Sequence, residues 1–328
     1  MIENFFLKIW YSSNIFYLFI SLILLPLSFI YLIVVYINRN LTKQKKFQVP
    51  ILCVGNINIG GTGKTSTLLS LLPELIKNRP NLVVLLRGYK GRIKSLYKVN
   101  TEIDSSVDVG DEALMYANIV TTYISSKRID AIENIIKLES PDIIILDDGF
   151  QDASIEKDKN LVLINGDRGF GNNFILPSGP LREIPSSALR KSDILIFIGE
   201  DKNGIYKKYK HLIKGNQMFN GKIVANLKGS DKKYFAFSGI GNNESFFKTL
   251  KNNNFIVTKK MTFPDHYQYS NEEVENIIKI ANQEDLTPIT TEKDINRITP
   301  ELRNKIECLK IKIEFEKQEE LINEMLNL

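Results

Sequence analysis

Apolar residues are grouped in distinct patterns along this chain, and the first of them predicts a membrane segment. Residues 15–37 form an apolar run without a charged residue. At about 1.5 Å per residue, a helix of this length can cross a hydrocarbon core of ~30 Å. A cleaved signal peptide would have a shorter apolar stretch and a small-residue cleavage site, whereas bulky residues continue to the end of this run. We therefore predict a retained N-terminal transmembrane helix. The alternative is a buried or interfacial helix with a kink at Pro26.

Short apolar runs rich in Ile, Val and Leu form the second pattern, and helix-like stretches separate them. Continuous apolar strands that alternate with helices are typical of a parallel sheet covered on both faces. These runs lie at residues 51–54, 82–86, 143–146, 161–164 and 194–198. Residues 201–221 are richer in Lys, Asn and Gly, which indicates a boundary or solvated connection.

A second set of strand and helix patterns follows this connection. Its clearest helix begins after Ser270, which forms a capping box with Glu273 and is followed by apolar residues at helical spacing. The predicted domains are an anchor helix over residues 1–40, a nucleotide-binding domain over 41–220, and a second α/β domain over 221–328 that closes over the active site.

Composition changes this picture in only a few respects. A length of 328 residues favours two domains plus extras. The net charge of +5 arises largely beside the apolar run, from Arg39, Lys43, Lys45 and Lys46. This placement favours anionic lipid over nucleic acid, and it puts everything after Arg39 in the cytoplasm. Two distant cysteines provide no disulfide framework.

A glycine-rich turn directly follows the strand pattern at 51–54 and leads into a helical run. Backbone N–H groups of such a turn surround phosphates, while a lysine contacts the terminal phosphates and a hydroxyl reaches Mg²⁺. The predicted nucleotide contacts are Asn58, Ile59, Gly60, Gly61, Thr62, Gly63, Lys64, Thr65 and Ser66. The strict P-loop pattern has glycine where this chain has Asn58. The alternative, a glycine-rich turn with a chance Gly-Lys-Thr, does not account for the flanking strand and helix.

The strand pattern at 143–146 ends in Asp147 and Asp148. Carboxylates at this end of an α/β sheet can hold Mg²⁺ directly or through water, while Thr65 provides a further ligand. The alternative is a solvated acidic pair. Together with the P-loop, the pair predicts ATP and Mg²⁺ as cofactors. The fold class is therefore α/β, with a P-loop NTPase-type parallel sheet, helices on both faces, a second smaller α/β domain and an N-terminal transmembrane helix.

Further motifs select among the many functions of P-loop proteins. They are Arg87-Gly88-Tyr89, Val109-Gly110-Asp111-Glu112, Asp147-Asp148-Gly149-Phe150-Gln151, residues 168–172, residues 176–183, residues 237–242, Phe263-Pro264-Asp265-His266 and Thr291-Glu292-Lys293-Asp294. In this order the set resembles the tetraacyldisaccharide 4'-kinase (lipid A 4'-kinase) family. The resemblance extends from the anchor to at least Asp294.

The resemblance implies transfer of the γ-phosphate of ATP, with Mg²⁺, to the 4'-hydroxyl of an acylated glucosamine disaccharide 1-phosphate. The product would be lipid IVA of lipid A (lipopolysaccharide) biosynthesis, made at the cytoplasmic face of the inner membrane. It further implies that Asp111 is the catalytic carboxylate and that His266 pairs with it. Residues implied to contact substrate phosphate or to shape the site are Arg87, Tyr89, Arg128, Gln151, Arg182 and Glu183. No nucleic acid and no obligate protein partner are expected.

The chain departs from the family pattern at two positions. Asp152 stands where the family commonly has histidine, which questions any contact of that histidine with an anionic substrate. Ser66 replaces a frequent proline in the first helical turn, where either residue is accepted. Two other functions remain open: a membrane-targeted P-loop ATPase switch and a kinase of a soluble substrate with an incidental anchor. The switch class places lysine before the paired glycines, where this chain has Ile59.

Overall fold

The computed structural model describes residues 2–213 and 218–328, and the chain divides into two compact units. Unit 1 comprises Met1–Lys222 and Ile313–Leu328, and unit 2 comprises Ile223–Lys312. The predicted second domain of residues 221–328 therefore differs from unit 2 at its C-terminal end. The chain returns to unit 1 there, because β13 (Ile311–Phe315) joins the large sheet beside β8 (Met218–Ala225).

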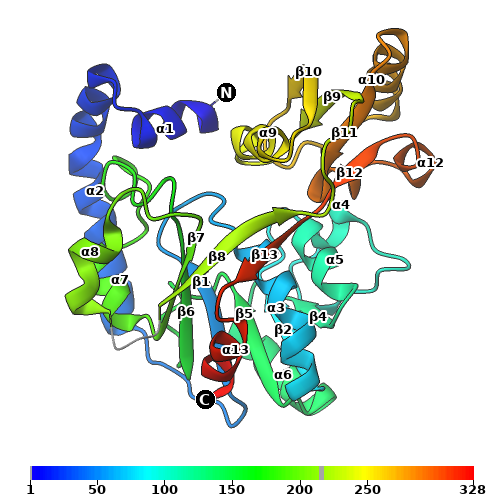
Figure 1. Cartoon of the computed structure of the whole chain (residues 1–328). Coiled ribbons are helices and arrows are strands. Elements are labelled where there is room, and N and C mark those ends of the chain that lie inside the picture. Colours follow the sequence, from blue (N-terminus) through cyan, green and yellow to red (C-terminus); the bar gives the residue numbers. More distant parts are fainter. Residues whose placement is uncertain (1, 214–217) are drawn as a thin grey trace. The chain divides into compact units, whose positions relative to one another are not determined.

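Within the described residues, unit 1 contains a nine-stranded sheet in the order β13-β8-β7-β6-β1-β5-β2-β4-β3 (Figure 1). Neighbouring strands from β8 to β4 are parallel, and β3 is antiparallel to β4. The other strands are β1 (Ile51–Asn56), β2 (Leu82–Leu86), β3 (Tyr97–Lys98), β4 (Thr121–Ile124), β5 (Ile143–Asp147), β6 (Lys159–Asn165) and β7 (Ile194–Ile198). Each of the five apolar runs predicted as a strand between residues 51 and 198 is confirmed, because all five lie in the buried interior of this sheet.

The helices of unit 1 cover both faces of this sheet. Helix α3 (Lys64–Asn78) leads from β1 to β2, and helix α6 (Arg128–Glu139) leads from β4 to β5. These two connections run in opposite directions across the sheet, so right-handed crossovers place the two helices on opposite faces. The helices are α3 (Lys64–Asn78), α4 (Ser106–Val109), α5 (Asp111–Ala117), α6 (Arg128–Glu139), α7 (Pro185–Lys191), α8 (Ile205–Tyr209) and α13 (Gln318–Leu326). The predicted connection at 201–221 contains α8, a 3₁₀ turn (Lys210–Leu212) and the start of β8, while residues 214–217 lie outside the described part.

Two N-terminal helices, α1 (Ile2–Tyr11) and α2 (Ile15–Leu41), are joined by a short turn in unit 1, and α1 runs crosswise to α2 (Figure 1). One face of α2 lies against the body of this unit. The Ser28 hydroxyl donates to the Ile175 carbonyl at 2.8 Å, and the Tyr31 hydroxyl donates to the Arg182 carbonyl at 3.1 Å. Near its end, Arg39 donates to the Ser187 hydroxyl at 3.2 Å.

The opposite face of α2 is apolar and exposed. At 100° per residue, Phe19, Ile23, Ile30 and Ile37 share one side of the helix, across from Ser28. Their exposed fractions range from 47% to 61%. By length and composition α2 is able to cross a membrane. In the structure, however, the hydrogen bonds of Ser28, Tyr31 and Arg39 hold α2 against the body of unit 1.

Unit 2 contains a four-stranded parallel sheet within its described residues, in the order β10-β9-β11-β12. The elements are β9 (Lys233–Ser238), α9 (Asn243–Asn252), β10 (Ile256–Thr262), α10 (Asn271–Gln283), β11 (Thr287–Thr291), α11 (Glu292–Ile295), α12 (Pro300–Arg303) and β12 (Glu307–Leu309). The capping box of Ser270 and Glu273 is confirmed at the start of α10. Val274 and Ile277 of this helix pack in a core with Phe237 of β9.

Candidate active site

The glycine-rich turn connects β1 to α3 at the carboxyl end of the central strand. Gly60 and Gly63 have φ values of 105° and 90°, which are unfavourable for residues with a Cβ atom. Gly63 is the N-cap of α3, so the turn leads directly into the helix N-terminus. A Cβ atom on Gly60 or Gly61 would meet no atom within 4 Å. The turn therefore presents backbone N–H groups and a helix N-terminus to open space, as a phosphate site requires.

Asn58, the departure from the strict P-loop pattern, fixes this turn to the rest of unit 1. Its side chain is buried and donates to the Gly169 carbonyl at 2.8 Å and to the Tyr11 hydroxyl at 3.3 Å. Glycine has no side chain to form these bonds. The asparagine thus links the phosphate turn to helix α1 and to the loop after β6.

The two carboxylates at the end of β5, Asp147 and Asp148, lie beside this turn, because β5 pairs with β1 and places Asp147 opposite Val54. Asp148 accepts a hydrogen bond from Arg182 at 2.8 Å, and the Lys64 ammonium lies 3.3 Å away. Burial raises the pKa of Asp148, but the charges of Lys64 and Arg182 outweigh it and lower the pKa to about 2. Asp148 is therefore a permanent anion held between two cations.

Asp147 has the opposite environment. Its Oδ2 accepts from the Tyr116 hydroxyl at 3.1 Å, whereas its buried Oδ1 has no hydrogen-bond partner among the described residues. Burial, and secondly the nearby Glu112 carboxylate, raise the pKa of Asp147 to about 7. The Thr65 hydroxyl donates to Glu112 at 2.7 Å. An unsatisfied carboxylate oxygen beside a second acid and a P-loop hydroxyl is a site that a cation would stabilise.

These residues fit Mg²⁺, although no group of three or more His, Cys, Asp or Glu side chains is placed for a metal within the described chain. In phosphate-transfer sites Mg²⁺ takes one or two carboxylates, a hydroxyl and phosphate oxygens, and it keeps several waters. Asp147 and Thr65 would supply the protein ligands. Sequence reasoning gave no role to Glu112 and Tyr116. Their spacing of four residues puts both on one face of α5, but only the contacts of Tyr116 with Asp147 and of Glu112 with Thr65 reveal their place in the site.

Four of the supporting residues that the sequence predicted surround the same strand ends. Gln151 donates to the Asn56 carbonyl at 2.9 Å and accepts from Arg182 at 3.1 Å. Its Nε2 also lies 3.4 Å from Glu183. Arg128 donates to the backbone carbonyls of both β5 acids, at 3.0 and 3.1 Å. These four side chains hold the strand ends and the carboxylates in place.

Asp152, which stands where the family commonly has histidine, pairs within the protein. Its Oδ2 lies 3.4 Å from Arg128, and its Oδ1 accepts from the Ser154 hydroxyl at 2.6 Å. Burial raises the pKa of Asp152, but the Ser154 hydrogen bonds and Arg128 outweigh it and lower the pKa. The additional negative charge is therefore balanced by Arg128.

The remaining predicted residues are distributed over both units. Asp111 is the first residue of α5 and is only 3% exposed. Arg87 and Tyr89 follow β2 and are exposed. His266 lies in unit 2, in a turn after β10, with its Nε2 atom 3.6 Å from Asp265. Because Asp111 and His266 belong to different units, their pairing stays a prediction.

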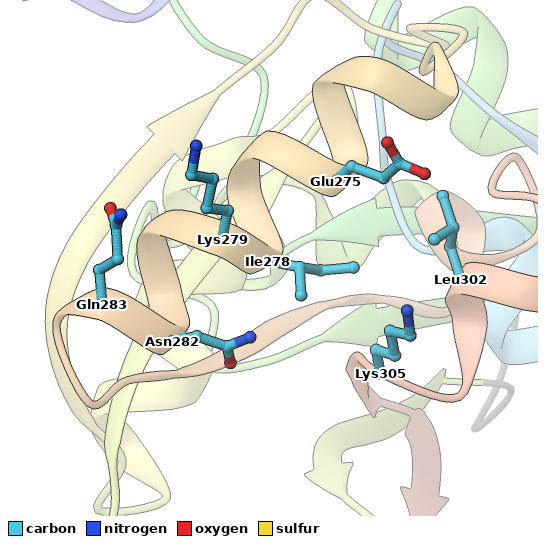
Figure 2. A pocket seen from close by; sticks show the side chains of 7 residues that line it. All are labelled: Glu275, Ile278, Lys279, Asn282, Gln283, Leu302 and Lys305. Carbon is cyan, nitrogen blue, oxygen red and sulfur yellow. The ribbon is translucent and has the colours of Figure 1, made fainter.

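A shallow groove of about 540 Å³ lies between α10 and α12 of unit 2 (Figure 2). Ile278 and Leu302 form its apolar part, and Lys279 and Lys305 stand at its rim. None of the predicted site residues lines it. We therefore do not assign the active site to this groove.

Comparison with known proteins places the chain in one family. A family model described as tetraacyldisaccharide-1-P 4'-kinase (LpxK) matches residues 20–328. Proteins named tetraacyldisaccharide 4'-kinase from Rickettsia peacockii (strain Rustic) and Rickettsia akari (strain Hartford) are 34% and 35% identical over 327 residues, which is 99% of this chain and 99% and 98% of the relatives. A crystal structure of LpxK from Aquifex aeolicus in complex with ATP is 27% identical with a TM-score of 0.71, and the match covers 93% of this chain and 98% of that one.

Proposed function

The chain belongs to the tetraacyldisaccharide-1-P 4'-kinase family, and from this premise we propose that it transfers the γ-phosphate of ATP to the 4'-hydroxyl of a tetraacylated glucosamine disaccharide 1-phosphate. The observation that carries the proposal is the meeting of the phosphate turn, Asp147 and Asp148 at adjacent strand ends. The P-loop ATPase switch is not favoured, because the family match includes the whole of unit 2 as well as the nucleotide-binding unit.

The nucleotide is held by groups of unit 1. Backbone N–H groups of the turn and the α3 N-terminus bind the phosphates, and Lys64 moves from Asp148 to the terminal phosphates. Asp147 and Thr65 would hold Mg²⁺, which would neutralise negative charge on the phosphate oxygens. Arg182 keeps Asp148 ionised and in place while Lys64 serves the nucleotide.

The acceptor hydroxyl is activated by Asp111, and His266 works with it. As the sugar oxygen attacks phosphorus, its proton passes to the Asp111 carboxylate, and the bond to the ADP oxygen breaks. His266 orients that carboxylate or relays the proton. The exposed side chains of Arg87 and Tyr89 contact the anionic substrate. The low exposure of Asp111 supports this role, since it keeps bulk water, a competing phosphoryl acceptor, away from this carboxylate.

Helix α2 attaches the enzyme to the inner membrane, with both units on the cytoplasmic side. Its apolar face is bare while its other face is hydrogen-bonded to unit 1, an arrangement that suits insertion of the exposed face into the cytoplasmic leaflet. Lys43 and Lys46 follow the helix and favour anionic lipid. The substrate cannot leave the bilayer, so this attachment keeps the active site near it.

Serine substitution of Phe19, Ile23, Ile30 and Ile37 should release the protein from membranes without unfolding it. Each large apolar side chain contributes about 1.5–3 kcal/mol when it leaves water, so vesicle binding should weaken by about 100-fold or more. Sedimentation with vesicles of anionic phospholipid measures this. The melting temperature in detergent is the control, because the four side chains are exposed and their loss creates no cavity. Unchanged sedimentation would show that other parts of the chain attach it.

The proposed reaction is tested with purified protein, γ-labelled ATP and two acceptors, the acyl disaccharide 1-phosphate and its deacylated core. Label should appear on the acylated acceptor and require Mg²⁺. Faster labelling of the core would support a soluble substrate instead. ATP hydrolysis without any labelled acceptor would favour the switch. A Lys64→Met variant, inactive in transfer, controls for contaminating kinases.

A further inference from the structure

Unit 2 contains a buried ion pair to which neither the phosphate site nor the family motifs give a role. Arg297 and Asp294 have completely buried side chains, and Nη1 lies 3.1 Å from Oδ1. Burial raises the pKa of Asp294, and the charge of Arg297 opposes this rise. Buried ion pairs are expensive to desolvate and contribute little net stability, so a role in fixing one local structure is a reason to keep them.

The pair holds both sides of a single residue, Gly239, which follows strand β9. The Gly239 N–H donates to Asp294 Oδ1 at 3.0 Å, and its carbonyl accepts from Arg297 Nη1 at 2.8 Å. The Asp294 carboxylate also accepts hydrogen bonds from two hydroxyls, that of Tyr269 at 3.0 Å and that of Thr291 at 2.7 Å. The carboxylate and guanidinium therefore clamp the two peptide groups that flank Gly239, one through its N–H and the other through its carbonyl.

The clamped residue is also the backbone partner of His266. The His266 N–H donates to the Gly239 carbonyl at 3.0 Å, the same oxygen that Arg297 binds. His266 has a φ of 58°, an uncommon value for a residue with a side chain, so its conformation depends on such restraints. A Cβ atom on Gly239 would lie 3.0 Å from Tyr267 Cβ and 3.1 Å from the Pro264 carbonyl, so a side chain there would require this turn to shift by a few tenths of an ångström.

Aromatic rings also pack within this turn. Phe263 and Tyr267 have ring centroids 4.7 Å apart, and Tyr269 lies 5.0 Å from the first and 5.3 Å from the second. The Tyr269 hydroxyl is one of the donors to Asp294, so the ring cluster and the ion pair belong to the same structure. The turn that carries His266 is thus fixed both by the clamp and by packed rings.

We propose that Asp294 and Arg297 are positioning residues for phosphoryl transfer, which act through Gly239 on the backbone, and hence on the imidazole, of His266. The inference rests on the proposed role of His266 in the reaction. It gives the Thr291-Glu292-Lys293-Asp294 motif a function that needs no contact between this motif and ATP or lipid.

The kinetic test is a double-mutant cycle between the clamp and His266. In Asp294→Asn/Arg297→Met both charges are removed together, so that no buried charge remains unpaired. We expect kcat to fall by about 10- to 100-fold, because small displacements of catalytic groups have effects of this size. KM for ATP should hold, since the nucleotide groups belong to unit 1. In a His266→Ala background the same double substitution should change kcat by less than about twofold.

Equal losses of kcat in both backgrounds would overturn the proposal, because a purely structural role does not depend on His266. Unchanged kcat in the wild-type background, with intact folding, would also overturn it. The melting temperature is recorded for every variant. Lys232→Met, which breaks an exposed pair with Glu307 in the same unit, is the matched control and should leave kcat unchanged.

A second measurement reads the position of His266 without activity. The chain has only two histidines, His211 and His266, so ¹⁵N-histidine labelling yields two imidazole spin systems that His211→Gln assigns. In Arg297→Lys, a milder change that retains the charge, the His266 signals should shift and those of His211 should not. Unchanged chemical shifts of His266 in this variant would refute the positioning role. If His266→Ala alone retains full activity, the proposed mechanism fails, whereas the signal shift still tests the clamp.

Discussion

Asp147→Asn is expected to abolish phosphoryl transfer and, at the same time, to stabilise the metal-free protein above pH 7. Loss of a metal ligand removes several kcal/mol of transition-state stabilisation, which corresponds to a fall in kcat of about 10²- to 10⁴-fold. Stability rises because the native carboxylate is buried beside Glu112 with an unsatisfied oxygen. Functional sites often contain such destabilising arrangements.

The pH dependence of this effect follows from the pKa of Asp147. Its folded value of about 7 lies above the unfolded value of about 4, so the folded protein binds more protons between these two limits. Stability is therefore lost as pH rises through this window. Asparagine does not ionise, so the variant avoids this loss of stability, although the amide hydrogens of the new side chain need hydrogen-bond partners. A net gain of about 1–2 kcal/mol, or roughly 2–8 °C, is expected at pH 8 and a smaller one at pH 5.

Asp148→Asn is the matched control, because it changes the adjacent carboxylate in the opposite environment. Asp148 is held by Lys64 and Arg182, so the asparagine variant should melt at a lower temperature than wild type at pH 8. Melting curves without Mg²⁺ and transfer assays with it measure both effects. A lower melting temperature for Asp147→Asn at pH 8 would show that burial and Glu112 do not strain this carboxylate.

Each part of the site that is formed by one short segment of the chain could be predicted from the sequence. The turn before Lys64 and the acids after β5 carry their own short-range signals, and the alternation of apolar runs with helices predicts that both sit at the same end of a parallel sheet. The structure confirms this placement through the pairing of Val54 with Asp147. Local sequence patterns were sufficient for this prediction, because the phosphate-binding turn and the acidic pair each lie within one short segment of the chain.

Roles that depend on contacts between distant segments could not be predicted. The roles of Tyr116 and Arg297 follow only from what they touch, Asp147 in one case and Gly239 in the other. The return of β13 to the large sheet depends on its pairing order, which an apolar run does not encode. For α2 a signal was present: Ser21 and Ser28 are two turns apart and mark the docked face, but an average over the whole run conceals them.

Asp111→Asn is expected to lower kcat by about 10²- to 10⁴-fold while ATP still binds, because a general base contributes about this much. The amide keeps the shape of the buried side chain at the start of α5 but cannot accept the proton of the sugar hydroxyl. ATP affinity should hold, since the phosphate turn and Lys64 are unchanged. Single-turnover transfer and the binding of a fluorescent ATP analogue measure the two quantities separately. Near-normal turnover would exclude Asp111 from the chemistry.

Two further variants show whether Asp111 acts together with His266. Asp108→Asn alters a carboxylate three residues earlier, in the exposed capping box with Ser105, and should leave kcat near the wild-type value. The double variant Asp111→Asn/His266→Ala should lose little more than Asp111→Asn alone, because residues that act as one unit have strongly non-additive effects. Multiplied losses would mean that His266 serves a separate step. The cycle thus measures the coupling of two residues from different units through the reaction itself.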